Sequence, residues 1–196
     1  MRRVLGVDPG THRMGFGVVE EVGNRLVAVA YGTLRAQASA PLPERLVTLY
    51  RAIKEALSAH APDSVAIEDV FFGKSHLAAI RIGEGRAVAL LAAAELGLAV
   101  CEYPPALVKK SVASNGAATK DQVAAMVKTI LGLRSATIEP DASDALAIAV
   151  THLHRARWAR ATTGLSSPPA PRPRTRSRRA RPAPRAAGTG GGIVPA

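Results

Sequence analysis

Four acidic residues stand where carboxylates could act together on one substrate. Asp8 and Glu68 each end a short apolar run that predicts a strand, and α/β sheets gather their chemistry at the carboxyl ends of strands. Asp141 and Asp144 are three residues apart at the start of a predicted helix, so they share one face of its first turn. Taken singly, each acid also fits a structural role in a turn, at a strand end or in the first turn of a helix.

As a group, these carboxylates indicate a metal site. Clustered carboxylates repel one another and persist where a divalent cation neutralises them. Oxygen ligands suit Mg²⁺ or Mn²⁺ rather than Zn²⁺, and the single cysteine, Cys101, excludes a multi-cysteine zinc site. Two such ions about 4 Å apart can activate water and stabilise the leaving oxygen of a phosphodiester. The group therefore predicts hydrolysis of a phosphodiester.

The elements that must position the acids follow from the hydrophobic pattern. Strands are predicted at 3–8, 16–20, 26–34, 64–69 and 98–103, and helices at 42–60, 75–96, 106–114, 120–131 and from 140 to 158. A Gly23-Asn24 turn joins the second and third strands in a hairpin, and Gly10, Gly15 and Gly17 are interpreted as loop residues. The order predicts an α/β fold, a mixed five-stranded sheet flanked by helices. With one carboxylate at the end of the first strand, one at the end of the fourth and a pair on the last helix, the arrangement is ribonuclease-H-like.

Three motifs resemble the RuvC family of bacterial Holliday-junction resolvases. They are Leu5-Gly-Val-Asp-Pro-Gly-Thr-His-Arg-Met-Gly-Phe-Gly17, Ala66-Ile-Glu-Asp-Val-Phe-Phe72 and Asp141-Ala-Ser-Asp-Ala-Leu-Ala-Ile-Ala149. With the segments between them, the resemblance covers 3–154. It implies a dimeric endonuclease that binds four-way DNA junctions and nicks two opposed strands symmetrically.

The resemblance also assigns roles to the acids. By position, Asp8, Glu68, Asp141 and Asp144 match the catalytic metal ligands of the family. It therefore implies that they hold two Mg²⁺ or Mn²⁺ ions per subunit, and that cleavage leaves a 5′-phosphate and a 3′-hydroxyl.

Residues after the second motif are expected to contact DNA. Phe71 matches the base-contacting phenylalanine of the family, and an exposed aromatic beside a nuclease site can stack on bases; the neighbouring Phe72 also fits core packing. Lys74, Ser75 and Arg81 are candidate phosphate contacts. The family typically has Asn where Ser75 stands, and Gln-Ala-Arg-Gly where this chain has Glu-Gly-Arg-Ala at 84–87.

A second basic group consists of Lys109, Lys110 and Lys120. Lys109 and Lys120 match family lysines near the scissile phosphate, where an ammonium group can attract the backbone and offset developing negative charge. Lys110 fits a DNA contact and a solvated helix face about equally.

The positive charge of the chain is concentrated at its C-terminus. The 196 residues carry a formal net charge of +11, yet 155–196 holds ten arginines and no Lys, Asp or Glu. Proline and glycine are frequent there and large apolar residues are few, so the segment cannot bury enough surface to fold alone. We therefore expect a nuclease domain at 1–160 and a disordered basic tail at 161–196. The tail is either a phosphate-binding arm or a solvated extension.

The expected partners follow from the substrate. A four-way junction has approximate two-fold symmetry, which predicts a homodimer, with the Ala-rich helix at 78–96 as the candidate interface. The resemblance further implies cooperation with the RuvA–RuvB branch-migration complex. No apolar run approaches the roughly 20 residues that span a bilayer, and no signal core follows the N-terminus. We therefore expect no membrane association and a cytoplasmic location.

Other functions stay open from the sequence. The loop at 6–11 also resembles the phosphate loop of actin-like and sugar-kinase ATPases, although those enzymes need a second lobe of comparable size. A junction-binding protein without catalysis would not need four acids. A nuclease of the same fold could instead act on RNA or on duplex ends.

Overall fold

The computed structural model describes residues 2–69 and 76–162. The strands are β1 (Arg2–Asp8), β2 (Arg13–Val22), β3 (Arg25–Arg35), β4 (Ser64–Glu68) and β5 (Ala99–Tyr103). The helices are α1 (Leu42–His60), α2 (His76–Glu95), α3 (Pro105–Ala113), α4 (Lys120–Leu131) and α5 (Pro140–Thr162). No helix in this described part is long and apolar enough to cross a membrane.

The strands form one mixed sheet in the order β3-β2-β1-β4-β5. β1 runs antiparallel to β2 and parallel to β4, and β4 runs parallel to β5. The parallel strands β1 and β4 therefore end at the same edge of the sheet, which brings Asp8 and Glu68 to that edge. The predicted α/β fold with a mixed five-stranded sheet is confirmed.

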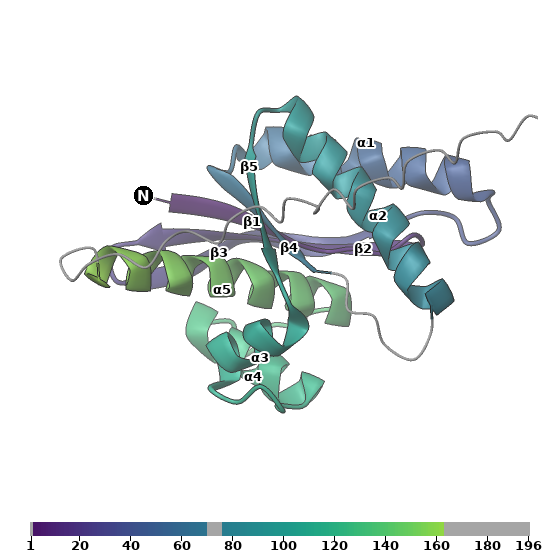
Figure 1. The fold of residues 1–196 in the computed structure, drawn as a ribbon. Helices are drawn as coiled ribbons and strands as arrows, with labels where there is room; N and C mark the ends of the chain where they lie inside the picture. The colour runs from purple at the N-terminus through teal and green to yellow at the C-terminus, as the bar shows by residue number, and fades with distance from the viewer. Residues whose placement is uncertain (1, 70–75, 163–196) are drawn as a thin grey trace, which may run out of the picture.

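Helices cover both faces of the sheet (Figure 1). Side chains of β1 alternate between the two layers, because successive residues of a strand point to opposite faces. Leu5 and Val7 are fully buried with residues of α1 and α2, whereas Val4 is buried with residues of α3, α4 and α5. β1 is thus the central strand, enclosed on both faces.

Glycines on β1 and β2 allow α5 to lie directly on the sheet. A Cβ atom on Gly6 would lie 2.1 Å from the carbonyl oxygen of Ala145, and one on Gly17 would lie 2.8 Å from Leu146. Real Cβ atoms do not approach other atoms so closely, so only glycine permits this helix position. The close approach carries the first turns of α5 to the end of β1.

The loop predicted before the second strand is too long, because Gly15 lies within β2. β2 begins at Arg13, and Gly15 pairs with Asp8 in the sheet register. A Cβ atom at Gly15 would lie 1.9 Å from the carbonyl oxygen of Asp141. Gly15 and Gly17 are strand residues that allow the backbone of α5 to approach closely, which is a common reason for glycine in a strand interior.

Candidate active site

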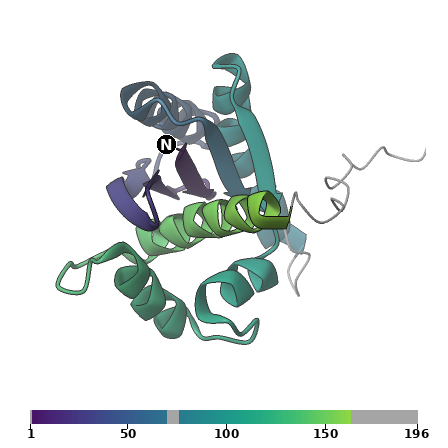
Figure 2. The same cartoon turned by 90° about the vertical axis from the view of Figure 1, so that its left-hand side faces the viewer.

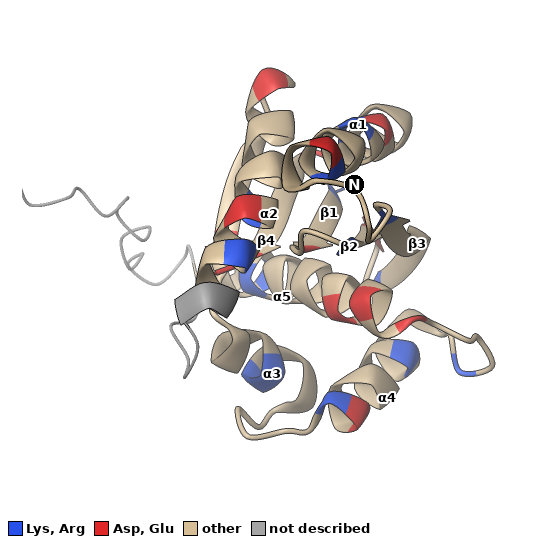
Figure 3. Ribbon diagram, turned by 90° about the vertical axis from the view of Figure 1, so that its right-hand side faces the viewer, with Lys and Arg blue, Asp and Glu red and all other residues tan. Residues whose placement is uncertain are grey.

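A pocket of about 330 Å³ lies at the edge of the sheet where β1 and β4 end. Two strands supply Asp8 and Glu68, α5 supplies Asp144, and α3 and α4 supply Lys109 and Lys120. Figure 3 views this end of the molecule, with acidic positions on α5 and basic positions on α3 and α4. The apolar part of the lining consists of Pro105, Val108, Val123, Ala147 and Ile148.

The start of α4 fixes the position of Lys120. The Thr119 hydroxyl accepts a hydrogen bond from the backbone N–H of Gln122, and the Gln122 side chain accepts one from the backbone N–H of Thr119. This capping box defines the first turn of the helix. From that turn, the Lys120 ammonium donates a hydrogen bond of 3.0 Å to Oδ2 of Asp144.

Negative charge accumulates around Asp8. Burial first, and then repulsion from Glu68, Asp144 and Asp141, raises the pKa of this carboxyl to about 7, against a smaller opposing effect of Lys120. Burial, followed by the charge of Asp144, also raises the pKa of Glu68, although Lys120 and Lys109 act in the opposite sense. The lysines therefore compensate only part of the negative charge.

Asp141 stands beside the pocket rather than in its lining. Its Oδ2 lies 2.6 Å from Nε of Arg13, the first residue of β2. Arg13 is also 3.6 Å from Glu139, which lies 2.6 Å from Arg35. The structure thus brings Asp8, Glu68 and Asp144 together in one pocket. Asp141 lies next to this pocket, close enough for its charge to raise the pKa of Asp8.

The chemistry of the acids fits a hard divalent cation. All of the donors are carboxylate oxygens, and their mutual repulsion is relieved by a positive ion. Lys120 pairs with Asp144 and Arg13 pairs with Asp141. Across the described ranges, no three His, Cys, Asp or Glu residues are grouped so that they could hold a metal ion as they stand. A cation would therefore compete with these two basic side chains for the carboxylates.

The remaining predicted DNA contacts divide into two sets. Arg81 on α2 and Lys110 on α3 are exposed and do not line the pocket. The others, Phe71, Phe72, Lys74 and Ser75, lie outside the described residues.

Sequence reasoning missed the partners that hold the acids in place. Arg13 lies outside the predicted strands, and its contact with Asp141 joins segments far apart in the chain. Gly85 of α2 was also missed: a Cβ atom there would lie 2.6 Å from the carbonyl oxygen of Gly10, in the loop that follows Asp8. A signal for the strand glycines did exist, because Gly15 and Gly17 are spaced so that they lie on one face of a strand.

Comparisons with known proteins agree with this geometry. Residues 4–152 match the family model of the crossover junction endodeoxyribonuclease RuvC. The RuvC of Myxococcus xanthus is 51% identical over 156 residues, which are 79% of this chain and 82% of that protein. The RuvC of Desulfitobacterium hafniense (strain DSM 10664 / DCB-2) is 46% identical over 151 residues, 77% of this chain and 92% of that protein.

Solved structures extend the similarity to three dimensions. The structure of T. thermophilus RuvC in complex with Holliday junction substrate superposes with a TM-score of 0.76 at 35% identity, covering 81% of this chain and 96% of that one. The yeast mitochondrial Holliday junction resolvase Ydc2, at 10% identity and a TM-score of 0.61, covers 83% of this chain and 84% of its own and shares the fold. The match to the family model, the identity to its members and the carboxylate pocket lead to one conclusion: this chain belongs to the RuvC family of crossover junction endodeoxyribonucleases.

Proposed function

We propose that this chain cuts four-way DNA junctions at the pocket formed by Asp8, Glu68 and Asp144, with Asp141 completing the acidic set. As a member of the RuvC family, it is a crossover junction endodeoxyribonuclease that resolves Holliday junctions in recombination and repair. The observation that supports this site best is the elevated pKa of Asp8, about 7, at the end of the central strand. A carboxyl with a pKa near neutrality is only partly ionised at about pH 7, and a bound cation would favour its ionised form.

The four acids would hold two Mg²⁺ or Mn²⁺ ions per subunit. Such ions, when bound, supply an activated water and a counter-charge for the departing 3′ oxygen. Asp8 and Glu68 are held by the strand ends, and Asp144 by the close approach of α5, so the carboxylates are positioned before substrate arrives. The backbone is thus in place, whereas the Asp144 and Asp141 side chains would exchange their basic partners for the cation.

The lysines of the pocket have a separate role. Lys120 and Lys109 face the carboxylates from α4 and α3, where an ammonium group can attract the DNA backbone and offset negative charge on phosphorus oxygens. A cation held by Asp144 would displace Lys120 from that carboxylate and leave its ammonium group free to contact phosphate. Phe71, Phe72, Lys74, Ser75, Arg81 and Lys110 remain proposed DNA contacts around this centre.

Paired nicking requires two such pockets, and α2 offers a surface for a homodimer. Ile80 and Leu91 are 58% and 56% exposed. They are eleven residues apart, or about three turns, so they lie on one face of the helix. Exposed apolar residues aligned in this way are typical of an interface. We further propose a cytoplasmic location and cooperation with a RuvA–RuvB complex.

The proposal is tested with a synthetic mobile four-way junction and Mg²⁺ or Mn²⁺. The expected products are symmetric nicks in two opposed strands that a ligase can seal, with no cutting of a linear duplex of the same sequence. Equal cutting of the linear duplex, or cutting of an RNA duplex in its place, would overturn the proposal. Thermal protection by ATP without protection by junction DNA would favour the ATPase interpretation.

A further inference from the structure

The end of the molecule opposite the carboxylates carries a second set of basic residues. The start of β1, the turn between β2 and β3, and the last turns of α5 meet at this end (Figure 2). Helix α5 joins the two ends: along it, Arg155 and Arg160 lie roughly 16 Å and 24 Å from Asp144, at about 1.5 Å per residue. The second set is therefore separate from the pocket that holds the acids.

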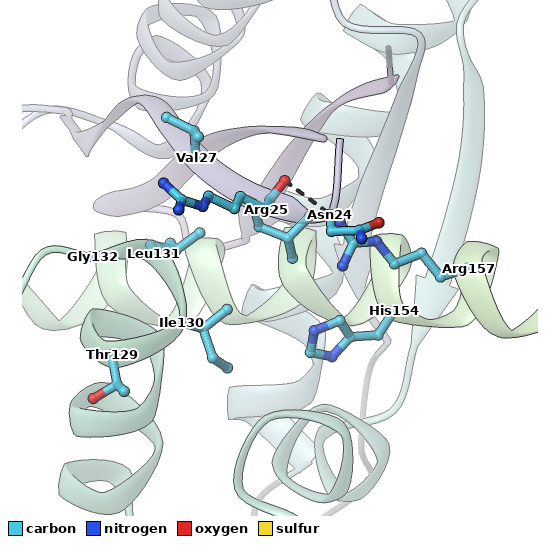
Figure 4. Close-up of a pocket in the computed structure, with 10 residues that line it drawn as sticks. Asn24, Arg25, Val27, Thr129, Ile130, Leu131, Gly132, His154 and Arg157 are labelled. Atoms are coloured by element: carbon cyan, nitrogen blue, oxygen red, sulfur yellow. Dashed lines mark hydrogen bonds between the residues drawn. The ribbon is translucent and has the colours of Figure 1, made fainter. Parts of the chain in front are cut away.

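Two hollows flank the turn between β2 and β3. The first, of about 490 Å³, lies between this turn, the end of α4 and α5, and it contains Arg25, His154 and Arg157 (Figure 4). None of the described residues that line it is acidic. The second, of about 400 Å³, is lined by Arg2, Glu21, Gly23 and Arg160. Both hollows thus present guanidinium groups beside the same turn.

Glu21 anchors the end of α5 to the sheet. Its Oε1 accepts a hydrogen bond of 2.6 Å from Nε of Arg157, and both of its carboxylate oxygens lie 2.8 Å from Nη2 of Arg160. Burial disfavours ionisation of Glu21, but these hydrogen bonds outweigh burial and hold its pKa below the ordinary value. One carboxylate therefore fixes two guanidinium groups and neutralises the charge of only one.

Three further arginines at this end add charge that nothing described neutralises. Arg2, Arg25 and Arg155 are exposed and form no ion pair with another residue in 2–69 or 76–162. Trp158 follows Arg155 by three residues, on the same face of the helix, and it is 61% exposed. An exposed indole beside a guanidinium offers a donor N–H and an aromatic surface in a cationic setting.

This basic end is largely outside the family match. The family model ends at residue 152, whereas α5 continues to Thr162. The chain then carries seven more arginines between 163 and 196 and no acid. The positive charge at this end is therefore additional to the carboxylate site.

We propose that Arg2, Arg25, Arg155, Arg157 and Arg160, with Trp158, form a distal basic surface that binds the phosphate backbone of duplex DNA without regard to sequence. The surface continues around the last turns of α5, since Arg155 and Trp158 lie on the face of the helix away from Arg157 and Arg160. The surface holds a duplex arm at a distance from the cutting pocket. The choice of duplex DNA as ligand rests on the proposed function, since the arms of a junction are duplexes. Binding at the surface itself requires neither metal nor cleavage, so the two proposals fail independently.

Trp158 reports on this surface directly, because it is the only tryptophan in the chain. The full chain is titrated with a short linear duplex in EDTA while tryptophan fluorescence is recorded, and binding is followed in parallel by the anisotropy of labelled duplex. We expect saturable quenching with the same midpoint as the anisotropy change. The double variant Arg25→Ala/Arg155→Ala should bind the duplex severalfold more weakly. The slope of the logarithm of the binding constant against the logarithm of salt concentration should become shallower by about 2, since each lost phosphate contact reduces that slope by about 0.9.

Two comparisons make the test specific. Arg51→Ala removes one exposed charge from α1 and should leave the salt slope unchanged, in contrast to Arg155→Ala alone. Lys109→Ala/Lys120→Ala should retain the quenching. The inference is overturned if duplex binds with no change in Trp158 fluorescence, if the double arginine variant keeps the wild-type slope, or if the lysine variant abolishes the quenching. Junction cleavage, assayed separately with metal, decides the proposed function.

Discussion

At the scale of single residues, the charge state of Asp8 connects the structure to the chemistry. Its pKa of about 7 results first from burial and then from three neighbouring acids. A raised pKa means that the folded protein binds the proton of Asp8 more tightly than the unfolded chain does. The same environment that makes Asp8 unfavourable as a free anion makes it a strong ligand for a cation.

This shift predicts how the stability of the metal-free protein depends on pH. The contribution of Asp8 to the free energy of unfolding should be highest below about pH 4. It should fall as pH rises from 3.8, the ordinary pKa of the carboxyl, through about 7, its pKa in the folded protein. The loss is on the order of 4 kcal/mol for a shift of this size, and Glu68 adds in the same direction. Urea unfolding in EDTA at a series of pH values measures it.

Asp8→Asn provides the matched variant for that prediction. It should flatten most of the pH dependence and be more stable than the wild type near about pH 8, because the amide carries no charge. Mg²⁺ should stabilise the wild type there and have little effect on the variant. A wild-type stability that stays constant or rises over this range would show that Asp8 is not held in a raised-pKa environment.

At the scale of elements, the sequence predicted the helices better than the strands. The predicted bounds of α1 and α4 are confirmed, since prolines and a capping box define their starts. β2 extends further than predicted, because Gly15 and Gly17 are strand residues whose missing side chains make room for α5 and do not mark a loop. The meeting of Asp8 and Glu68 could be expected from strand ends, and that of Asp144 with them from the family resemblance. The Arg13–Asp141 pair could not, because it depends on how α5 lies across β2.

The packing of α5 is tested by Gly17→Ala. The new Cβ would lie 2.8 Å from Leu146, so α5 must move, and overpacking of this kind costs about 1–3 kcal/mol. The displacement should also slow junction cleavage, because Asp144 is carried on the same helix. Gly116→Ala is the control, since its Cβ would lie at an ordinary 3.5 Å from Ala106. Equal stabilities for the two variants in denaturant unfolding would contradict the packing argument.

At the scale of the whole molecule, the chain has two ends with different charge. The acids lie at one end of α5, and the arginines of the distal basic surface lie at the other. The net charge of +11 therefore describes the C-terminal part of the chain, whereas the proposed catalytic centre is defined by negative charge. A dimer formed through α2 would present two such centres to one junction.

The dimer is tested by Leu91→Glu. A carboxylate on the apolar face of α2 should convert the protein from dimer to monomer in sedimentation velocity and should uncouple the paired nicks. Met126→Glu, at a residue of α4 that is 39% exposed, places the same charge elsewhere and should leave the dimer intact. A Leu91→Glu protein that sediments as a dimer would exclude this interface.

The proposed division into a nuclease domain at 1–160 and a basic tail at 161–196 makes a prediction of its own. Deletion of the residues after Gly164 removes seven arginines. DNA binding should weaken and its salt dependence should become shallower, while junction cleavage persists. An unchanged salt slope would indicate that the tail makes no phosphate contacts.

The central claim, that these carboxylates bind the metal that cuts the junction, is tested most directly by Asp8→Asn and Asp144→Asn. Each variant is compared with Asp121→Asn, which changes an exposed acid in the first turn of α4. Junction binding and cleavage are measured on the same preparations with Mn²⁺. We predict that both variants bind the junction as the wild type does but cut it more than about a hundredfold more slowly, since loss of even an outer-shell partner costs 10–100-fold. Cleavage by either variant at the rate of Asp121→Asn would contradict the account.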